Sequence, residues 1–351
     1  MDYERFKEGF QDALKAELTV RGAKVDLESR RVDKMNESYD AITVRPVDSA
    51  IGVNVSVEKA FAAYENGTSI SDIANHFADA VENGLRESPQ FDIASISDYE
   101  QMKNKLFMEV VSAERNAELL QSVPHEKMED MAVVYRFMVD QGESGNGTIL
   151  ITNQMLDQYG ITKEQLRADA LENAPEIRPS EIRGMSEVMS ELAPGMLPEV
   201  APEDEQMFVA TVPDKIHGAG VIAYPNFMED AAQKMGGDFF VLPSSIHEVL
   251  LVRDNGQMTA KELENMVKEV NATQVEPADQ LTDHVYHYDS KNHIFEMADK
   301  FEERMREAEH DAADKDSVLG DLKEKKKEIA KKEPAKDATT KAATKKHETS
   351  L

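Results

Sequence analysis

The 351-residue sequence contains no cysteine, and this absence excludes disulfide bonds, thiolate metal sites and cysteine nucleophiles. The first ten residues, MDYERFKEGF, are charged and lack the basic segment and apolar stretch of a secretory signal. Apolar runs are also short. The run Met131–Val139 is interrupted by Arg136 and is far below the length of about 20 residues needed to cross a bilayer. We therefore expect a cytoplasmic protein that does not enter a membrane.

Positive charge is scarce outside the C-terminal segment. Residues 322–351 contain ten lysines and five acidic residues, a net charge of +5. Because the whole chain carries −28, residues 1–321 carry −33. Such an acidic body repels phosphate backbones, and nucleic acid binding needs a positive surface. In the tail, acidic residues separate the lysines and no aromatic residue is present to stack on bases. We therefore expect a protein or small-molecule partner rather than nucleic acid.

Hydrophobic periodicity predicts an α+β fold. Phe6, Phe10, Leu14 and Leu18 recur at helical spacing, whereas β-branched residues alternate in other segments. Predicted helices cover residues 1–18, 70–81, 163–173 (ended by Pro175), 226–234 and 259–270. Predicted strands cover residues 42–46, 51–57, 106–111, 131–139, 148–152, 208–212, 220–224, 238–242, 246–252, 284–288 and 294–297.

These elements predict two mixed α/β units with mainly antiparallel sheets, residues 1–122 and 123–298. A proline-containing loop is expected at residues 186–206. Residues 299–351 are predicted to be a charged helix followed by a disordered, lysine-rich tail. A coiled coil is not expected in this tail, because its heptad a and d positions would be mostly charged.

The motif Ser244-Ser245-Ile246-His247-Glu248 is the strongest candidate for chemistry. If a strand begins at Ser245, alternation places Ser245 and His247 on one face, roughly 7 Å apart. A serine nucleophile must lie about 3 Å from its base, and no G-x-S-x-G elbow is present. Glu248 follows His247 as in H-E-x-x-H zinc peptidases, but Leu251 stands at the second histidine position. We favour a turn stabilised by the serine hydroxyls, with His247 hydrogen-bonded for structural reasons.

Two histidines near the end of the second unit are candidate metal ligands. His284 and His287 lie in the segment Asp283–Asp289, three positions apart, so on one strand they face opposite sides. His217 precedes Gly218-Ala219-Gly220 and is interpreted as a loop residue. No phosphate-binding glycine pattern is present. The sequence therefore predicts neither a metal nor a cofactor.

Four stretches resemble an uncharacterised bacterial family known only as a domain of unknown function. They are ILITNQMLDQYGIT (149–162), GAGVIAYP (218–225), DFFVLPSSIHEVLLV (238–252) and MVKEVNATQVEPADQLTDHVYHYD (266–289). The resemblance covers about residues 1–295, and the family is found mostly in Gram-positive anaerobes, often near mobile elements. It implies no activity, cofactor or partner. It does imply that the Ser244–Glu248 motif and Asp283-His284-x-Tyr286 are family features. The candidate ligand-binding residues are Asn153, Asp283, His284 and Tyr286.

Two functional hypotheses follow. The first, which we favour, is a cytoplasmic, non-catalytic binding or structural protein of the bacterial cell. The alternative is a hydrolase that uses Ser244 or Ser245 as nucleophile and His247 as general base, assisted by Asp283 or His284. An enzyme requires a site into which His247 and a second polar group converge, so the surroundings of His247 distinguish the two.

Overall fold

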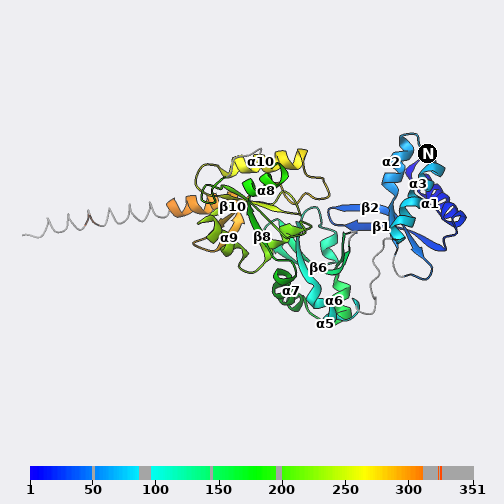
Figure 1. Ribbon diagram of the computed structural model, residues 1–351, viewed down its shortest axis with the longest axis horizontal. Helices are drawn as coiled ribbons and strands as arrows, with labels where there is room; N and C mark the ends of the chain where they lie inside the picture. The colour runs from blue at the N-terminus through cyan, green and yellow to red at the C-terminus, as the bar shows by residue number, and fades with distance from the viewer. Residues whose placement is uncertain are drawn as a thin grey trace, which may run out of the picture. The chain divides into compact units, whose positions relative to one another are not determined.

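The structure, a computed structural model, describes residues 1–49, 52–86, 96–142, 145–194, 200–310, 323 and 325. The chain divides into two compact units, Met1–Ala298 and Asp299–Leu351, which are described separately. The first unit combines helices with antiparallel sheets (Figure 1), so the predicted α+β class is confirmed. In the second unit residues 299–310 are helical. The rest of the predicted charged helix and the predicted disordered tail lie outside the described residues, apart from Lys323 and Lys325.

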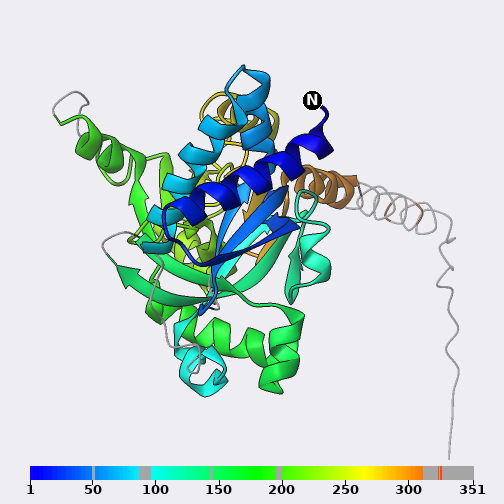
Figure 2. The same ribbon diagram turned by 90° about the vertical axis from the view of Figure 1, so that its right-hand side faces the viewer.

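The first sheet has the strand order β1-β2-β3 and is antiparallel. Its elements are α1 (Tyr3–Val20), β1 (Val25–Lys34), β2 (Glu37–Pro46), β3 (Val53–Ser56), α2 (Val57–Glu65) and α3 (Ile70–Arg86). The predicted apolar face of α1 is confirmed, because Phe6, Phe10, Leu14 and Leu18 are all fully buried. Figure 2 shows α1 lying across these strands. With residues of α2, α3 and the sheet it forms a core of its own.

The strand β1 was not predicted. It carries the sequence VDLESRRVDK, most of whose side chains are exposed, so it lacks the apolar alternation on which sequence interpretation relies. Pairing with β2 defines it instead, in a ladder that runs from Val25 opposite Pro46 to Lys34 opposite Glu37. The connecting residues Met35 and Asn36 form a tight turn, here called the hairpin tip, with Asn36 at a φ of +58°.

The second sheet has the order β4-β6-β5, and β7 also pairs with β6. Its strands and neighbouring helices are α5 (Tyr99–Met102), β4 (Leu106–Ser112), β5 (His125–Met128), β6 (Met131–Gly142), β7 (Gly145–Leu150), α6 (Asn153–Tyr159) and α7 (Lys163–Ile177), with 3-10 turns at Lys103–Lys105 and Leu119–Gln121. The strands predicted at 106–111 and 131–139 are confirmed. They pair with each other, so hydrogen bonds connect the two sides of the predicted domain boundary at residue 122.

The prediction that Pro175 ends its helix was wrong, because α7 continues to Ile177. Ala174 is fully buried in the main core, and its carbonyl accepts a hydrogen bond from the Arg178 amide at 2.9 Å. Packing and this terminal hydrogen bond therefore hold the last turn despite the missing donor of the proline.

The third sheet is antiparallel, in the order β13-β12-β10-β11-β9-β8. Its elements are β8 (Glu181–Gly184), α8 (Met185–Leu192), β9 (Met207–Thr211), a 3-10 helix η3 (Gly218–Ala223), α9 (Phe227–Met235), β10 (Phe239–Leu242), β11 (Val249–Arg253), α10 (Ala260–Thr273), β12 (Tyr286–Asp289) and β13 (Ile294–Met297). The largest apolar core joins the second and third sheets. Helix α8 occupies the start of the predicted loop 186–206, so that prediction was wrong there.

Residues 220–223 of the strand predicted at 220–224 belong instead to η3. This segment packs directly on other backbone. A Cβ at Gly220 would lie 2.3 Å from the carbonyl oxygen of Met108, and one at Gly218 would lie 2.4 Å from that of His247. These close approaches, which only glycine permits, favour the tight helical turn over an extended strand. They also bring β4 and the Ser244–Glu248 segment to the same place.

Candidate functional site

The Ser244–Glu248 motif forms a turn between β10 and β11 rather than a strand. The strand β11 begins at Val249, so the predicted start at residue 246 was wrong. The Ser245 hydroxyl accepts a hydrogen bond from the backbone N–H of His247 at 3.0 Å, which confirms the predicted serine-stabilised turn. Ser245 is buried and Glu248 is exposed. The alternation that would place Ser245 and His247 side by side on one strand face therefore does not apply.

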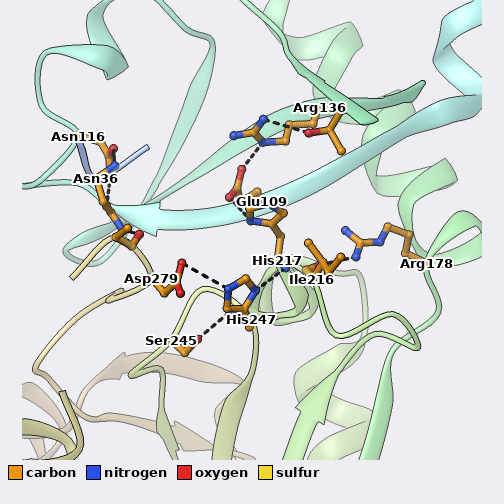
Figure 3. Close-up of polar contacts among 12 residues, drawn as sticks. Asn36, Glu109, Asn116, Arg136, Arg178, Ile216, His217, Ser245, His247 and Asp279 are labelled. Carbon is orange, nitrogen blue, oxygen red and sulfur yellow. Dashed lines mark hydrogen bonds and ion pairs between the residues drawn. The ribbon is translucent and has the colours of Figure 1, made fainter. Parts of the chain in front are cut away.

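Both ring nitrogens of His247 contact other groups (Figure 3). Nδ1 accepts a hydrogen bond from the backbone N–H of His217 at 3.2 Å. Nε2 lies 3.4 Å from Oδ1 of Asp279. Because Nδ1 accepts, a neutral ring carries its proton on Nε2, directed at Asp279. His247 thus connects two loops, and neither ring nitrogen is directed at a serine hydroxyl.

The His217 side chain is oriented by a buried carboxylate. Its Nδ1 lies 2.6 Å from Oε1 of Glu109, which is fully buried on β4. The other oxygen, Oε2, accepts from Nε of Arg136, whose side chain lies diagonally across from Glu109 on β6 (Figure 3). Burial raises the pKa of Glu109, but Arg136 and His217 more than offset this and hold it at about 2. The carboxylate is therefore charged at neutral pH.

In a neutral ring with its proton on Nδ1, facing Glu109, Nε2 of His217 is a hydrogen-bond acceptor. Within the part of the chain that the structure describes, no residue forms a hydrogen bond with this atom. The side chain is 21% exposed, so Nε2 is the atom of this cluster that a ligand could use.

The segment from Pro213 to Gly218, here called the histidine loop, is held in an unfavourable backbone conformation. Lys215 and His217 have φ values of +56° and +52°, a region that residues other than glycine adopt uncommonly, asparagine, aspartate and histidine more often than the rest. The guanidinium of Arg178 contacts the carbonyl oxygen of Ile216 and the carboxylate of Asp214. Arg178 is itself nearly buried and lies over the Phe107 ring, 4.7 Å from its centroid. A strained backbone conformation that surrounding contacts hold in place is typical of functional sites.

His284 belongs to a second cluster, centred on Asp130. The carboxylate of Asp130 contacts Nδ1 of His284 at 2.8 Å and accepts hydrogen bonds from the hydroxyls of Thr282 and Tyr286. Burial raises the pKa of Asp130, but these hydrogen bonds, led by that of Tyr286, outweigh it, so the pKa is lowered. Burial and the Asp130 charge raise the pKa of Tyr286. These contacts account for His284 and Tyr286 as residues that hold the start of β12 against the β5–β6 connection.

The remaining candidates lie elsewhere. Asp283 accepts a hydrogen bond from Asn271 at 2.7 Å, and Asn153 begins α6 and donates to the carbonyl of Gln121. His287 is fully buried, with Nε2 3.0 Å from Asp254, and burial lowers its pKa.

Among the described residues, no group of three histidine or acidic side chains could hold a metal ion. Nor is any described helix both long and apolar enough to cross a membrane.

The structure thus brings His247 together with residues that sequence interpretation did not select. Glu109, Arg136 and Arg178 were not considered, His217 was considered only as a loop residue, and Asp279 stands where Asp283 or His284 was expected. One signal was available. Glu109 is the only charged residue in the apolar strand LFMEVVS, and a buried acid requires a partner.

Comparison with known proteins adds a family but no activity. Neither a search of curated proteins nor a search of solved structures finds a match. The model of a family of unknown function, DUF5688, matches residues 3–290. This match spans most of the chain and all of the elements that build the site. The chain therefore belongs to the family of unknown function DUF5688.

Proposed function

We propose that this protein is a non-catalytic binding protein of the bacterial cytoplasm and that it binds its ligand at the histidine loop. The proposal rests on the hydrogen bonds that the Ser245 hydroxyl and the His247 ring accept. The Ser245 hydroxyl and Nδ1 of His247 each accept a backbone N–H. A serine nucleophile needs its hydroxyl hydrogen-bonded to the base, whereas here the hydroxyl stabilises its own turn and the His247 ring joins that turn to the histidine loop.

The loop has the properties of a preorganised binding surface. Arg178, His247 and Glu109 fix it at three separate points, so little conformational entropy remains to be lost when a ligand binds. The fixed ring of His217 presents Nε2 as an acceptor. The preferred ligand group is accordingly a hydrogen-bond donor.

Charge narrows the ligand class further. The nearby carboxylate of Asp279 is 37% exposed, and residues 1–321 carry a net charge of −33. A field of this sign favours the approach of cations and disfavours phosphates. We therefore favour a protein or small molecule that presents an amine or guanidinium group to His217.

The experiment compares two histidines in matched settings. Both His217 and His293 have a positive φ, and each places Nδ1 beside a glutamate, Glu109 at 2.6 Å and Glu229 at 3.3 Å. Asparagine tolerates positive φ, so His217→Asn and His293→Asn are comparable changes.

Wild type and both variants are used as bait in a bacterial lysate, and the retained proteins and small molecules are quantified by mass spectrometry. We expect His293→Asn to retain the wild-type ligand and His217→Asn to lose it. Equal retention by all three proteins would contradict the proposal.

A hydrolase is the second candidate, and the Glu109–His217 contact favours it. A carboxylate bonded to Nδ1 is the usual way to orient a general base, so His217 would activate a water molecule in the role that the sequence suggested for His247. A fluorophosphonate probe tests for a serine nucleophile with His247 as its base. An activated ester tests for water activation by His217. Labelling of Ser244 or Ser245 that disappears in His247→Gln, or ester turnover that disappears in His217→Asn, would overturn the non-catalytic proposal.

A further inference from the structure

The hairpin tip of the first sheet contacts the second sheet through a reciprocal pair of asparagines. The backbone N–H of Asn36 donates to Oδ1 of Asn116 at 2.7 Å, and Nδ2 of Asn116 donates back to Oδ1 of Asn36 at 2.8 Å (Figure 3). Asn116 is only 2% exposed and also donates to the carbonyl of Ser112. Beside this pair, Met35 packs against the apolar cluster that includes Val111. The tip is therefore fixed in position.

The Asn36 side chain also holds the loop that carries Asp279. Nδ2 of Asn36 donates to the carbonyl oxygens of Ala278 at 2.8 Å and Gln280 at 2.9 Å. These two carbonyls immediately precede and follow Asp279. Arg115 supports the same loop by donating to the carbonyl of Pro277 at 3.0 Å. The backbone on both sides of Asp279 is thus set by the hairpin tip and its neighbours.

The Asp279 loop in turn holds the Ser244–Glu248 turn. The carbonyl of Asp279 accepts from the amide of Ile246 at 2.9 Å, and the amide of Leu281 donates to the carbonyl of Ser244 at 3.1 Å. The side chain of Asp279 faces Nε2 of His247. A continuous series of contacts therefore runs from the hairpin tip through Asp279 and His247 to the backbone of His217.

We propose that Asn36 is a positioning residue for the histidine loop, so that the first sheet forms part of the binding site without contacting the ligand. This inference rests on the proposed function. Asparagine suits the position for two reasons: it tolerates the positive φ of the turn, and its amide supplies two donors, one for each carbonyl beside Asp279. When Asn36 loses these donors, Asp279 no longer holds the Nε2–H group of His247, so only the His217 amide at Nδ1 favours this tautomer and the preference weakens.

The test uses two substitutions at the tip and one control in the same hairpin. Asn36→Gly keeps the positive φ without strain and removes the side chain. Asn36→Asp keeps an acceptor for Asn116 but loses both donors. Ser38→Ala removes a hydrogen bond of 2.7 Å to Asp33, which lies within the hairpin and does not reach the second or third sheet.

Two measurements are made on the full-length proteins. Hydrogen exchange is followed at the amides of Ile246 and Leu281, with those of β10 as the internal reference for intact folding. Imidazole 15N chemical shifts report the tautomer of His247, which a purely structural role of the tip would leave unchanged.

For both Asn36 variants we expect exchange at Ile246 and Leu281 to be about tenfold faster, as the loss of one or two hydrogen bonds predicts. The His247 shifts are expected to change from the Nε2–H form towards a mixture of tautomers, while the β10 amides and Ser38→Ala stay at wild-type values. Unchanged exchange and tautomer in the Asn36 variants, or the same changes in Ser38→Ala, would overturn the inference. Neither measurement involves a ligand, so failure here is distinguishable from failure of the binding proposal.

Discussion

Oε1 of Glu109 lies 2.6 Å from Nδ1 of His217, a contact that joins a buried strand to a half-exposed loop. The carboxylate serves two cations or donors at once, because its second oxygen accepts from Arg136. A buried charge of this kind is costly to place in a protein unless it is paired and hydrogen-bonded. The stability of the fold and the geometry of the histidine loop therefore depend on the same side chain.

Replacement of Glu109 by glutamine should destabilise the fold strongly. Glutamine offers one acceptor oxygen, so it cannot serve both Arg136 and His217, and the guanidinium loses its counter-charge. We expect the free energy of unfolding to fall by about 3 kcal/mol, the lower end for a broken buried pair. Glu126→Gln is the control, because Glu126 pairs with Lys163 at the surface and should cost less than about 1 kcal/mol. Urea unfolding of both variants measures the difference, and equal losses would contradict the structural role of Glu109.

The pH dependence of the free energy of unfolding should reflect the titration of Glu109. The pKa of Glu109 is lowered from 4.5 to about 2 in the folded protein. A group whose folded pKa is lowered contributes stability above its unfolded pKa, and this contribution is lost as the pH falls through the folded value. Between about pH 4.5 and pH 2 wild type should lose about 3 kcal/mol more than Glu109→Gln. Parallel stability curves for the two proteins over this range would refute the lowered pKa.

Local sequence patterns predicted the elements whose periodicity is strong. Helix α1 and strand β6 were found because helical spacing and β-branched apolar runs reflect the burial of one face. Strand β1 was missed because its residues are mostly exposed and only its pairing with β2 makes it a strand. The 3-10 helix at Gly218–Ala223 was missed because close contact with β4, rather than intrinsic preference, selects it.

The site was only partly accessible from sequence. The turn at Ser245 could be predicted because the hydrogen bond from the His247 amide to the Ser245 hydroxyl is local. The partners of His217 could not, since Glu109 comes from β4 and reaches the histidine loop only in the folded chain. An isolated acid in an apolar strand signals that a partner exists, but it does not say which residue that partner is.

The C-terminal segment should be dispensable for folding of the first unit. The chain divides after Ala298, and the residues from Lys323 onward are mostly charged or small, so they offer little apolar surface to bury. Removal of residues 301–351 should change the free energy of unfolding by less than about 1 kcal/mol. Thermal melting of this truncation is compared with that of a second one that ends at Asp321. A larger loss for the longer deletion alone would show that residues 301–321 pack on the body.

Two neighbouring serines provide the closest test of the turn. The Ser245 hydroxyl accepts the His247 amide at 3.0 Å, whereas the Ser244 hydroxyl forms no hydrogen bond with any residue the structure describes. Ser245→Ala should therefore lower the free energy of unfolding by about 0.5–2 kcal/mol, because a backbone donor in a buried turn loses its acceptor.

Ser244→Ala should be nearly neutral. His247→Gln should also destabilise, since the rigid ring that connects the His217 amide to Asp279 is replaced by a flexible side chain. Melting curves of the three variants decide the matter. If all three match wild type, the turn does not stabilise the fold, and a catalytic reason for these residues would have to be sought.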